Sequence, residues 1–410
     1  MSRVIALCFL LLAAVIGFLH IDSRPVWVPF VISATQADEV VEESTTTKSK
    51  GSIKVGIPIP QSNWLPDTGA ASVHAASMIA LKDGAVRAFW FAGSREGAAD
   101  VSIYSSVYDS RSANWSAPTV VIDRIDAEKR LSRYIAKLGN PVPARLSDGR
   151  LQLFFVTVSM GGWAGSSISA MTSDDEGLTW SNPQRLISSP LLNLSTLVKS
   201  PSVMFSDGLL GLPAYHEWIG RFGEFLRIEA GQVIDKRRMS SGRSAIQPLI
   251  FVNDAQDANA YFRQTRSAGL PKQIPVSHTQ NAGQSWQPSE DLGIANPNSA
   301  VAGLALKNGS RILVLNNIEN GRYRLVLLIS DPKSQWQTVE VLEDDEALPE
   351  AQRKEFSYPY LITVDGDDAH LVYTWDRKKI RHRYFSGAWL KHSLSKAQSI
   401  EAEASRQEAQ

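Results

Sequence analysis

The chain has 410 residues and carries 42 Lys and Arg side chains against 42 Asp and Glu, so its formal net charge is zero. This balance argues against a nucleic-acid binder, which needs a basic surface to pair with phosphates, and against a polybasic membrane-surface protein. The single cysteine, Cys8, excludes an intramolecular disulfide and a cysteine-ligated metal site, and no two histidines form an H-x-H or H-E-x-x-H pair. We therefore expect no metal and no other cofactor.

The N-terminus carries a targeting segment. An apolar run from Val4 to Leu19 follows Arg3 and ends at the polar residues 20–24. Its length lies between those of a signal-peptide core and a membrane-spanning helix, and favours an uncleaved anchor over a cleaved signal. Either would put the rest of the chain outside the cytoplasm, in the periplasm or at the cell surface. We assign residues 1–30 to this segment and residues 31–54 to a solvated tether.

The body repeats one unit six times: an apolar strand, a turn of the Asp-Gly or Asn-Gly kind, and a second apolar strand. Asx and glycine residues accept the positive φ of a type I′ turn, so the unit predicts a β-hairpin. The turns lie at Asp83-Gly84, Asp148-Gly149, Asp207-Gly208, Asn253-Asp254, Asn308-Gly309 and Asp365-Gly366. Helical periodicity is weak, and the one helix that we predict in the body spans residues 346–354.

A second pattern runs beside the hairpins. Residues 173–180 fit S-x-D-x-G-x-[ST]-W at every fixed position, and residues 279–286 fit with Thr for Ser and Asn for Asp. In such an octet the Asx side chain binds turn amides, the glycine takes a positive φ, and the tryptophan packs between neighbouring sheets. The octets therefore predict structured hairpin ends in at least two of the repeats.

These octets are similar to the Asp boxes of the sialidase superfamily, and the wording of residues 90–97 and 373–375 resembles its bacterial and plant sialidase-like branch. The resemblance covers roughly residues 65–385. It implies an all-β fold, a six-bladed β-propeller of four-stranded antiparallel blades, which we place at residues 55–387. A polar C-terminal tail, residues 388–410, would follow, and within it residues 396–410 are expected to form a frayed helix without an apolar stripe. Asp boxes lie away from the active face and are structural.

The ligand site of a propeller lies at one mouth of its axis, where the innermost strands begin. Six polar groups precede the innermost strands, at His74, Asn140, Lys199, Gln247, Asn298 and Tyr358. The second strands return to the same mouth with Arg95, Glu96, Asp100, Glu217, Arg263, Arg322 and Arg377. Because a guanidinium binds a carboxylate through two parallel hydrogen bonds, arginines from several blades indicate an anionic ligand.

The resemblance also implies roles for single residues. Sialidases grip the substrate carboxylate with three arginines, use an Asp as acid and base, and use a Tyr as nucleophile that a Glu activates. Arg95 lies where the second arginine would be, Asp100 where the acid/base would be, and Tyr358 where the nucleophile would be. Arg263 and Arg322 lie on the blades that supply the remaining arginines.

Two positions depart from that pattern. His74 occupies the neighbourhood of the missing R-I-P motif in the first blade, and Gln247 stands where the activating glutamate would be. A glutamine side chain is not a base for the tyrosine proton, so Glu96 or Glu217 would have to reach Tyr358. Asn140 and Lys199 complete the expected substrate-binding set.

Three functions stay open from the sequence. The first is a glycoside hydrolase that removes a terminal acidic sugar, resembling sialic acid, through Tyr358 and Asp100. The second is a polysaccharide lyase on uronic-acid glycans, and the third is a non-catalytic glycan-binding propeller of the cell envelope. A carboxylate within hydrogen-bond reach of Tyr358 would favour the hydrolase. The expected partner is a glycan, with membrane contact through the N-terminal helix alone, and the expected state is a monomer.

Overall fold

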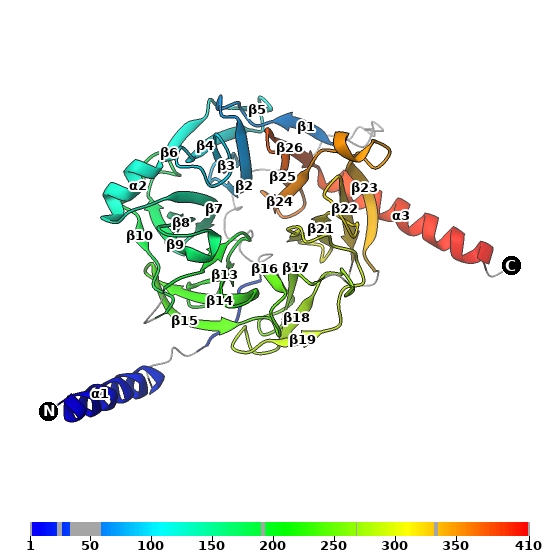
Figure 1. The fold of residues 1–410 in the computed structure, drawn as a ribbon. Coiled ribbons are helices and arrows are strands. Elements are labelled where there is room, and N and C mark those ends of the chain that lie inside the picture. The colour runs from blue at the N-terminus through cyan, green and yellow to red at the C-terminus, as the bar shows by residue number, and fades with distance from the viewer. Residues whose placement is uncertain are drawn as a thin grey trace, which may run out of the picture.

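The computed structural model describes residues 2–22, 27–32, 59–189, 193–267, 269–331 and 335–408. Most of the expected tether, from residue 33 to residue 54, lies outside these residues. In the described part, six β-sheets surround a common axis, as Figure 1 shows. Each sheet is antiparallel and has four or five strands, so the predicted six-bladed propeller is confirmed.

The strands follow the chain order from blade to blade. Blade 1 comprises β2 (Ser72–Ala80), β3 (Val86–Gly93), β4 (Ser102–Asp109), β5 (Asn114–Trp115) and β6 (Thr119–Ile122). Blade 2 comprises β7 (Lys137–Arg145), β8 (Leu151–Val158), β9 (Ser166–Ser173) and β10 (Gln184–Arg185). Blade 3 comprises β11 (Leu197–Val198), β12 (Val203–Met204), β13 (Leu210–His216), β14 (Phe222–Glu229) and β15 (Gln232–Arg238).

The remaining blades are built in the same way. Blade 4 comprises β16 (Ala245–Val252), β17 (Ala258–Gln264), β18 (Val276–Thr279) and β19 (Gln287–Ser289). Blade 5 comprises β20 (Ala302–Ala305), β21 (Arg311–Leu315), β22 (Arg324–Ser330) and β23 (Gln337–Asp344). Blade 6 comprises β24 (Phe356–Ile362), β25 (Ala369–Trp375), β26 (Lys379–Phe385) and the early strand β1 (Gln61–Trp64).

Strand β1 closes the ring, because it pairs with β26 from the far end of the sequence, with Gln61 opposite Tyr384 and Trp64 opposite Arg381. The Trp64 ring meets the Trp375 ring edge-on at 5.7 Å. The last blade therefore needs a strand that precedes the first blade in sequence, and the two ends of the propeller hold each other.

The five glycine-containing hairpin turns form, but not as type I′ turns. Each turn glycine has a φ between +81° and +86°, whereas the Asx residue before it does not have a positive φ. A type I′ turn needs positive φ at both central residues, so that part of the prediction was wrong. The Asx side chain instead accepts the amide two residues later at 2.8–3.1 Å in all five turns. This is the type I turn closed by a left-handed glycine.

The two predicted octets are confirmed and share one network. In the first, Asp175 accepts the Thr179 amide at 2.8 Å, and Ser173 Oγ accepts the Gly177 amide at 2.8 Å. In the second, Asn281 accepts the Ser285 amide and Thr279 Oγ1 accepts the Gly283 amide, each at 2.9 Å. The octet tryptophans, Trp180 and Trp286, meet Phe89 and Phe225 of the preceding blades edge-on.

Helices occur outside the blades. They are α1 (Ser2–Asp22), α2 (Arg124–Leu131) and α3 (Gly387–Glu408). No helix in the described ranges is long and apolar enough to cross a membrane. The helix expected at 346–354 was wrong, because this segment forms only a 3-10 turn at Glu350–Gln352.

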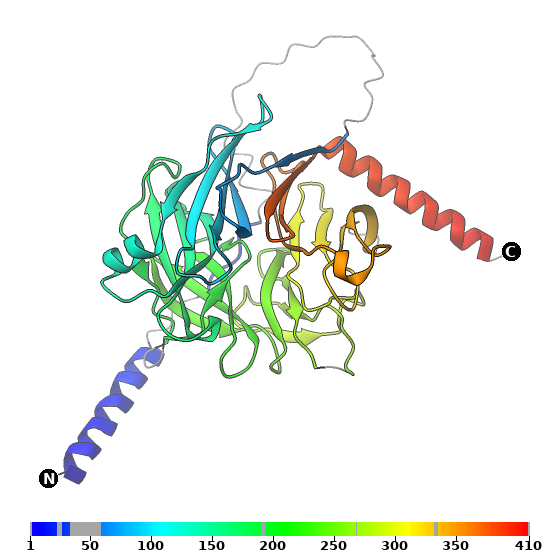
Figure 2. The ribbon, with the colours of Figure 1, turned by 45° about the horizontal axis from the view of Figure 1, so that its top comes forward.

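The C-terminal segment also differs from its expectation. Helix α3 runs outward from the ring (Figure 2), and its first turns carry Leu390 and Leu394, which are 2% and 8% exposed. These side chains pack into the core of blades 5 and 6, together with Trp389. The expected polar tail therefore has two buried leucines at its start, and the helix expected from residue 396 forms as part of α3.

A short arm, residues 27–32, is fastened to blades 3 and 4 at the ends of their first hairpins. The Phe30 amide donates to Ala255 O and the Val31 amide to Met204 O, both at 2.8 Å. The Phe30 ring stacks on the Phe205 ring at 5.2 Å, and its side chain is 3% exposed. Since those hairpin turns lie at the opposite end of the inner strands from the mouth, the arm lies on the far face of the ring.

Candidate functional site

Backbone bulges define the mouth. In β2, β7, β16 and β24 the pairing register slips by one residue near the start of the strand, so two residues face one on the partner strand. At each slip one residue has a φ in the left-handed region, namely Ala75, Asn140, Gln247 and Tyr358. In blade 5, Asn298 has the same conformation just before its strand. Left-handed non-glycine residues are strained, and such strain gathers at functional sites.

Blades 1, 2, 4 and 6 therefore carry the same backbone bulge near the start of the innermost strand. The bulge residue of blade 1 is Ala75, one position after the expected His74. Blade 3 carries Ser200-Pro201 between two short strands, where no positive φ occurs at the serine.

Gln247 is the hub of the mouth and is 1% exposed. Its Nε2 donates to Tyr358 Oη and to Tyr215 Oη, both at 3.2 Å, and its Oε1 accepts from Arg263 Nη1 at 3.4 Å. Asn140 Nδ2 reaches Tyr215 Oη at 3.4 Å. Burial raises the pKa of Tyr215 well above its ordinary value of 10.0 and keeps this phenol protonated. The structure thus brings the expected Asn140, Gln247, Arg263 and Tyr358 together.

Arginines and glutamates form a chain of ion pairs across the mouth. Arg322 Nη1 donates to Glu355 Oε1 at 3.0 Å, and Arg377 Nε donates to Glu355 Oε2 at 3.0 Å. Arg377 Nη1 also binds Glu96. Burial alone would raise the pKa of Glu355, but hydrogen bonds from Arg377 and Ser357 lower it to about 2. This chain joins blades 5, 6 and 1.

The sequence did not predict Glu355. It predicted that Arg377 lies at the mouth, but not the turn that places it there. Asp376 and Arg377 both have positive φ between β25 and β26, the combination that a type I′ turn needs. The turn has no glycine, so composition gave no sign of it. The available signal for Arg377 was a charged residue at a hairpin end on the mouth side. The signal for Glu355 was a glutamate three residues before the predicted strand start.

His74 is buried against Tyr358. The ring centroids are 4.3 Å apart, the His74 side chain is 1% exposed, and neither ring nitrogen has a described partner. Burial lowers the pKa of His74 to about 4, so the imidazole is neutral at pH 7. His74 therefore acts as an aromatic support for Tyr358.

Glu217 is half-buried, and burial raises its pKa while Arg263 and Arg221 oppose that rise. Its backbone amide donates to Ser195 Oγ at 2.7 Å. Tyr215 feels the charge of both Glu217 and Tyr358. Glu217 therefore lies in the electrostatic neighbourhood of the hub, but its described hydrogen bonds do not include Tyr358.

Asp100 and Arg95 stay on an exposed loop. Asp100 accepts from the Ser94 amide at 2.9 Å and from Ser94 Oγ at 3.0 Å. The hydrogen bond from the Ser94 side chain is the main reason why the pKa of Asp100 is lowered, although burial opposes this shift. No described contact brings either residue to Gln247 or Tyr358. Tyr358 Oη, for its part, has an amide as its described hydrogen-bond partner and no described carboxylate.

Lys199 lies beneath the mouth and is 6% exposed. Its Nζ donates to Val301 O at 2.9 Å and to Pro359 O at 2.6 Å, so it joins blade 3 to blades 5 and 6 across the axis. Burial and then Arg263 lower its pKa to about 7. Lys199 thus belongs to the site as a buried cation under the bulge that carries Tyr358.

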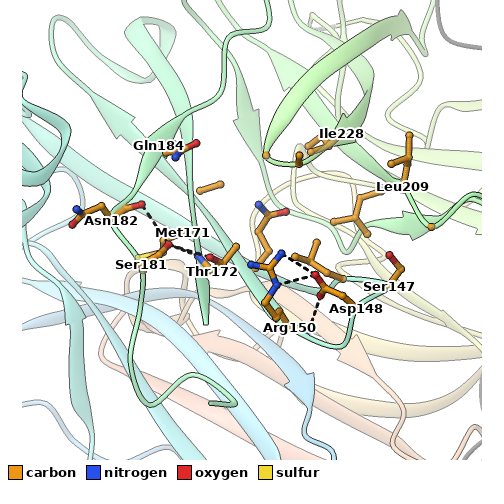
Figure 3. Close-up of a pocket in the computed structure, with 17 residues that line it drawn as sticks. Ser147, Asp148, Arg150, Met171, Thr172, Ser181, Asn182, Gln184, Leu209 and Ile228 are labelled. Atoms are coloured by element: carbon orange, nitrogen blue, oxygen red, sulfur yellow. Dashed lines mark hydrogen bonds and ion pairs between the residues drawn. The ribbon is translucent and has the colours of Figure 1, made fainter. Parts of the chain in front are cut away.

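A larger groove lies between blades 2 and 3, at the hairpin-turn end of their strands (Figure 3). Its volume is about 390 Å³, and its rim carries the Asp148–Arg150 pair, with Nε at 2.8 Å from Oδ2. Figure 3 shows this pair across from Asn182 and Gln184. Both charged partners are roughly half exposed, so the groove lacks the buried, convergent charges of the mouth. We therefore place the candidate site at the mouth.

The chemistry available at the mouth is anion recognition. Its cations are Arg263, Arg322, Arg377 and Lys199, and its neutral donors are amides and phenols. Across the described residues, no group of three or more His, Cys, Asp or Glu is placed to hold a metal ion.

Known structures share this fold. A protein of unknown function from Dyadobacter fermentans matches with a TM-score of 0.65 and 12% identity over 80% of this chain and all of that one. The Hadza microbial sialidase Hz136 matches with a TM-score of 0.64 and 13% identity, over 77% of this chain and 66% of that one. The leech intramolecular trans-sialidase matches with a TM-score of 0.60 and 13% identity, over 79% of this chain and 70% of that one.

At such identities these structures show the fold alone. No curated protein matches the chain. A family model does match: the BNR repeat-like domain aligns with residues 84–371, which is more than half of the chain. With its Asp boxes and its six blades, this chain therefore belongs to the BNR repeat-like domain family.

Proposed function

We propose that the mouth of this propeller binds an acidic sugar carried on a glycan. The observation that carries the proposal is the direction of the hydrogen bonds at the hub. The Gln247 amide donates to both phenol oxygens, at 3.2 Å each, and Arg263 donates to Gln247. The phenolic hydrogens of Tyr215 and Tyr358 and the Nη2 hydrogens of Arg263 are then left to donate, and their complement is a carboxylate.

Charge supports the same ligand. Arg263 Nε binds the neutral Asn298 Oδ1 at 2.7 Å, so no carboxylate neutralises its guanidinium through a described hydrogen bond. Arg322 and Arg377, in contrast, are paired with glutamates. Arg263 is therefore the guanidinium that is best placed to hold a ligand carboxylate, with Gln247 and Tyr358 beside it.

The test is a binding experiment with matched sugars. We would titrate the full chain with 3′-sialyllactose, trigalacturonate and lactose by isothermal calorimetry. The proposal expects binding of at least one acidic sugar, no binding of lactose, and weaker binding at high salt. Arg263→Ala should abolish it, while Arg150→Ala in the far groove should not. Equal binding of lactose, or unchanged binding by Arg263→Ala, would refute it.

Hydrolysis of the bound sugar is the second candidate, and Glu217 favours it. This half-buried carboxyl has a raised pKa, as a proton-transferring group needs, and it lies in the electrostatic neighbourhood of Tyr215. Tyr358 would attack the sugar while its phenolic proton passes to Glu217, and Asp100 would protonate the leaving group once its loop moves onto the ligand. Water would then release the sugar from Tyr358. The amide of Gln247 opposes this candidate, since it donates to Tyr358 and takes no proton from it.

A turnover assay separates these functions. A fluorogenic α-sialoside and acidic polysaccharides would be incubated with the wild type, Asp100→Ala, Tyr358→Phe and Glu217→Gln. Sialoside cleavage that all three variants lose would establish the hydrolase. Unsaturated sugar ends would instead point to a lyase, and binding without either product would leave a glycan-binding propeller.

A further inference from the structure

Lys199 is a buried cation on the propeller axis. Its side chain crosses from blade 3 to the carbonyls of Val301 and Pro359, and Pro359 directly follows Tyr358. In the protonated side chain, two of the three ammonium hydrogens donate to these carbonyls, and the third is left for another acceptor. Lys199 also lines, with Asn140, Tyr358 and Ser77, a small cavity of about 10 Å³, which is about the size of one water molecule.

This cation has no counter-charge in the described part of the chain. No described carboxylate forms an ion pair with Lys199, and the charged group that most affects it is Arg263, of like sign. Burying a cation without an anion is costly, and proteins normally respond by releasing the proton. The resulting pKa of about 7, lowered from 10.5, leaves the side chain poised between its two forms at neutral pH.

We propose that an acidic sugar bound at the mouth supplies the missing counter-charge for Lys199, and that its binding is coupled to proton uptake at Nζ. This inference rests on the proposed function. The proton comes from solvent, the neutral amine becomes an ammonium, and the sugar carboxylate stays ionised throughout. Lys199 is then a specificity-determining residue, because a neutral sugar brings no negative charge that would stabilise the protonated side chain.

Other titratable groups face the same space and need to be separated from Lys199. His74, with a pKa of about 4, stays neutral at pH 7.5 on both sides of the equilibrium unless its environment changes greatly. Tyr215 is held protonated by burial, and Arg263 is always charged. Tyr358 lines the same small cavity, and the ring of Tyr360, whose pKa burial raises, lies 5.9 Å from Nζ. Glu217, whose pKa burial raises, is a competitor that could take up a proton as an anion arrives.

The experiment is calorimetric titration of the full chain with 3′-sialyllactose, and separately with trigalacturonate, in phosphate and in Tris at pH 7.5. The difference in binding enthalpy between buffers of different ionisation enthalpy gives the number of protons taken up. We expect a substantial fraction of one proton for the wild type and for Glu217→Gln, and none for Lys199→Met. At pH 5.5 the Glu217→Gln variant should take up almost none, since Lys199 is already charged and the competing carboxyl is absent.

The conservative variant guards against a folding defect. Lys199→Arg keeps the charge at every pH, so it should bind without proton uptake and with an affinity that no longer falls between pH 6 and pH 9. Binding by the wild type without proton uptake would overturn this inference and leave the proposed function intact. Uptake that persists in Lys199→Met and disappears in Glu217→Gln would also overturn it. No binding of either acidic sugar by any variant would refute the proposed function itself.

Discussion

Glu355→Gln tests whether the ion-pair chain stabilises the propeller. The wild-type carboxylate accepts from Arg322 and Arg377 at 3.0 Å each and from Ser357 Oγ at 2.7 Å. At about 1.4 kcal/mol per pKa unit, the change from 4.5 to about 2 corresponds to roughly 3 kcal/mol. The side chain is 28% exposed, so solvent screening reduces this to about 2 kcal/mol at pH 7.

The sign follows from linkage. The folded-state pKa of Glu355 is lowered, so its contribution to the free energy of unfolding is complete above the unfolded pKa of about 4.5 and is lost as pH falls towards about 2. Urea unfolding at pH 7 should therefore show the wild type more stable than Glu355→Gln by about 2 kcal/mol, with more than half of the difference gone at pH 3.

A matched control is Glu346→Gln. Glu346 pairs with Arg324 at 3.2 Å, but its side chain is 57% exposed. Its substitution should change stability little at either pH, because exposed ion pairs contribute little. An equal effect of the two substitutions at pH 7, or a Glu355→Gln difference that does not shrink at pH 3, would refute the reasoning.

Three further outcomes are expected. Arg263→Lys keeps the charge but loses the planar fork, so acidic-sugar affinity measured by calorimetry should fall by roughly 10- to 100-fold, while Arg150→Lys leaves it unchanged; equal affinities would contradict the assigned carboxylate contact. Gln247→Glu places a carboxylate at the Tyr358 phenol, so fluorogenic sialoside turnover should rise above that of the wild type, and Gln247→Leu should show no such gain. Phe30→Ala removes a ring that stacks on Phe205, so thermal or urea unfolding should show a loss of about 3 kcal/mol, against almost none for Ile32→Ala at 40% exposure.

Local backbone patterns were the reliable part of the sequence. Asp-Gly turns and Asp-box octets report the conformation of a few consecutive residues, so six hairpins and two octets could be predicted without knowing their neighbours. The type of turn could not be predicted, because Asp-Gly occurs both in the expected type I′ turn and in the observed type I turn with a left-handed glycine. In the first hairpin the decision lies in the pairing of Leu81 with Ala85, which lengthens the loop.

Helix α2 was missed for a related reason. Helix α2 begins with an Asp123 cap that accepts the Asp126 amide at 2.8 Å, and it buries only Ala127, so its periodicity is weak. Leu390 and Leu394 of α3 have the i, i+4 spacing of a helix face, and this spacing is a local signal for a buried face at the start of the helix.

At the site, the strand starts were predictable and the ion pairs were not. Asn140, Gln247 and Tyr358 each precede a proline, which marks the bulge in the sequence. Glu355 and Arg377, however, find Arg322 and Glu96 on other blades, and the distance in sequence between Glu96 and Arg377 is 281 residues. No local pattern carries such a pairing.

The arm at residues 27–32 is held on one face of the ring, which has a practical consequence for attaching the protein to a surface. Because its backbone is hydrogen-bonded at Ala255 and Met204, the arm from Trp27 onward lies on the side of the ring that turns away from the mouth. A support attached directly before Trp27 would therefore leave the mouth open to approach. For anyone immobilising this protein on a bead or a sensor chip, the position before Trp27 is the one to attach.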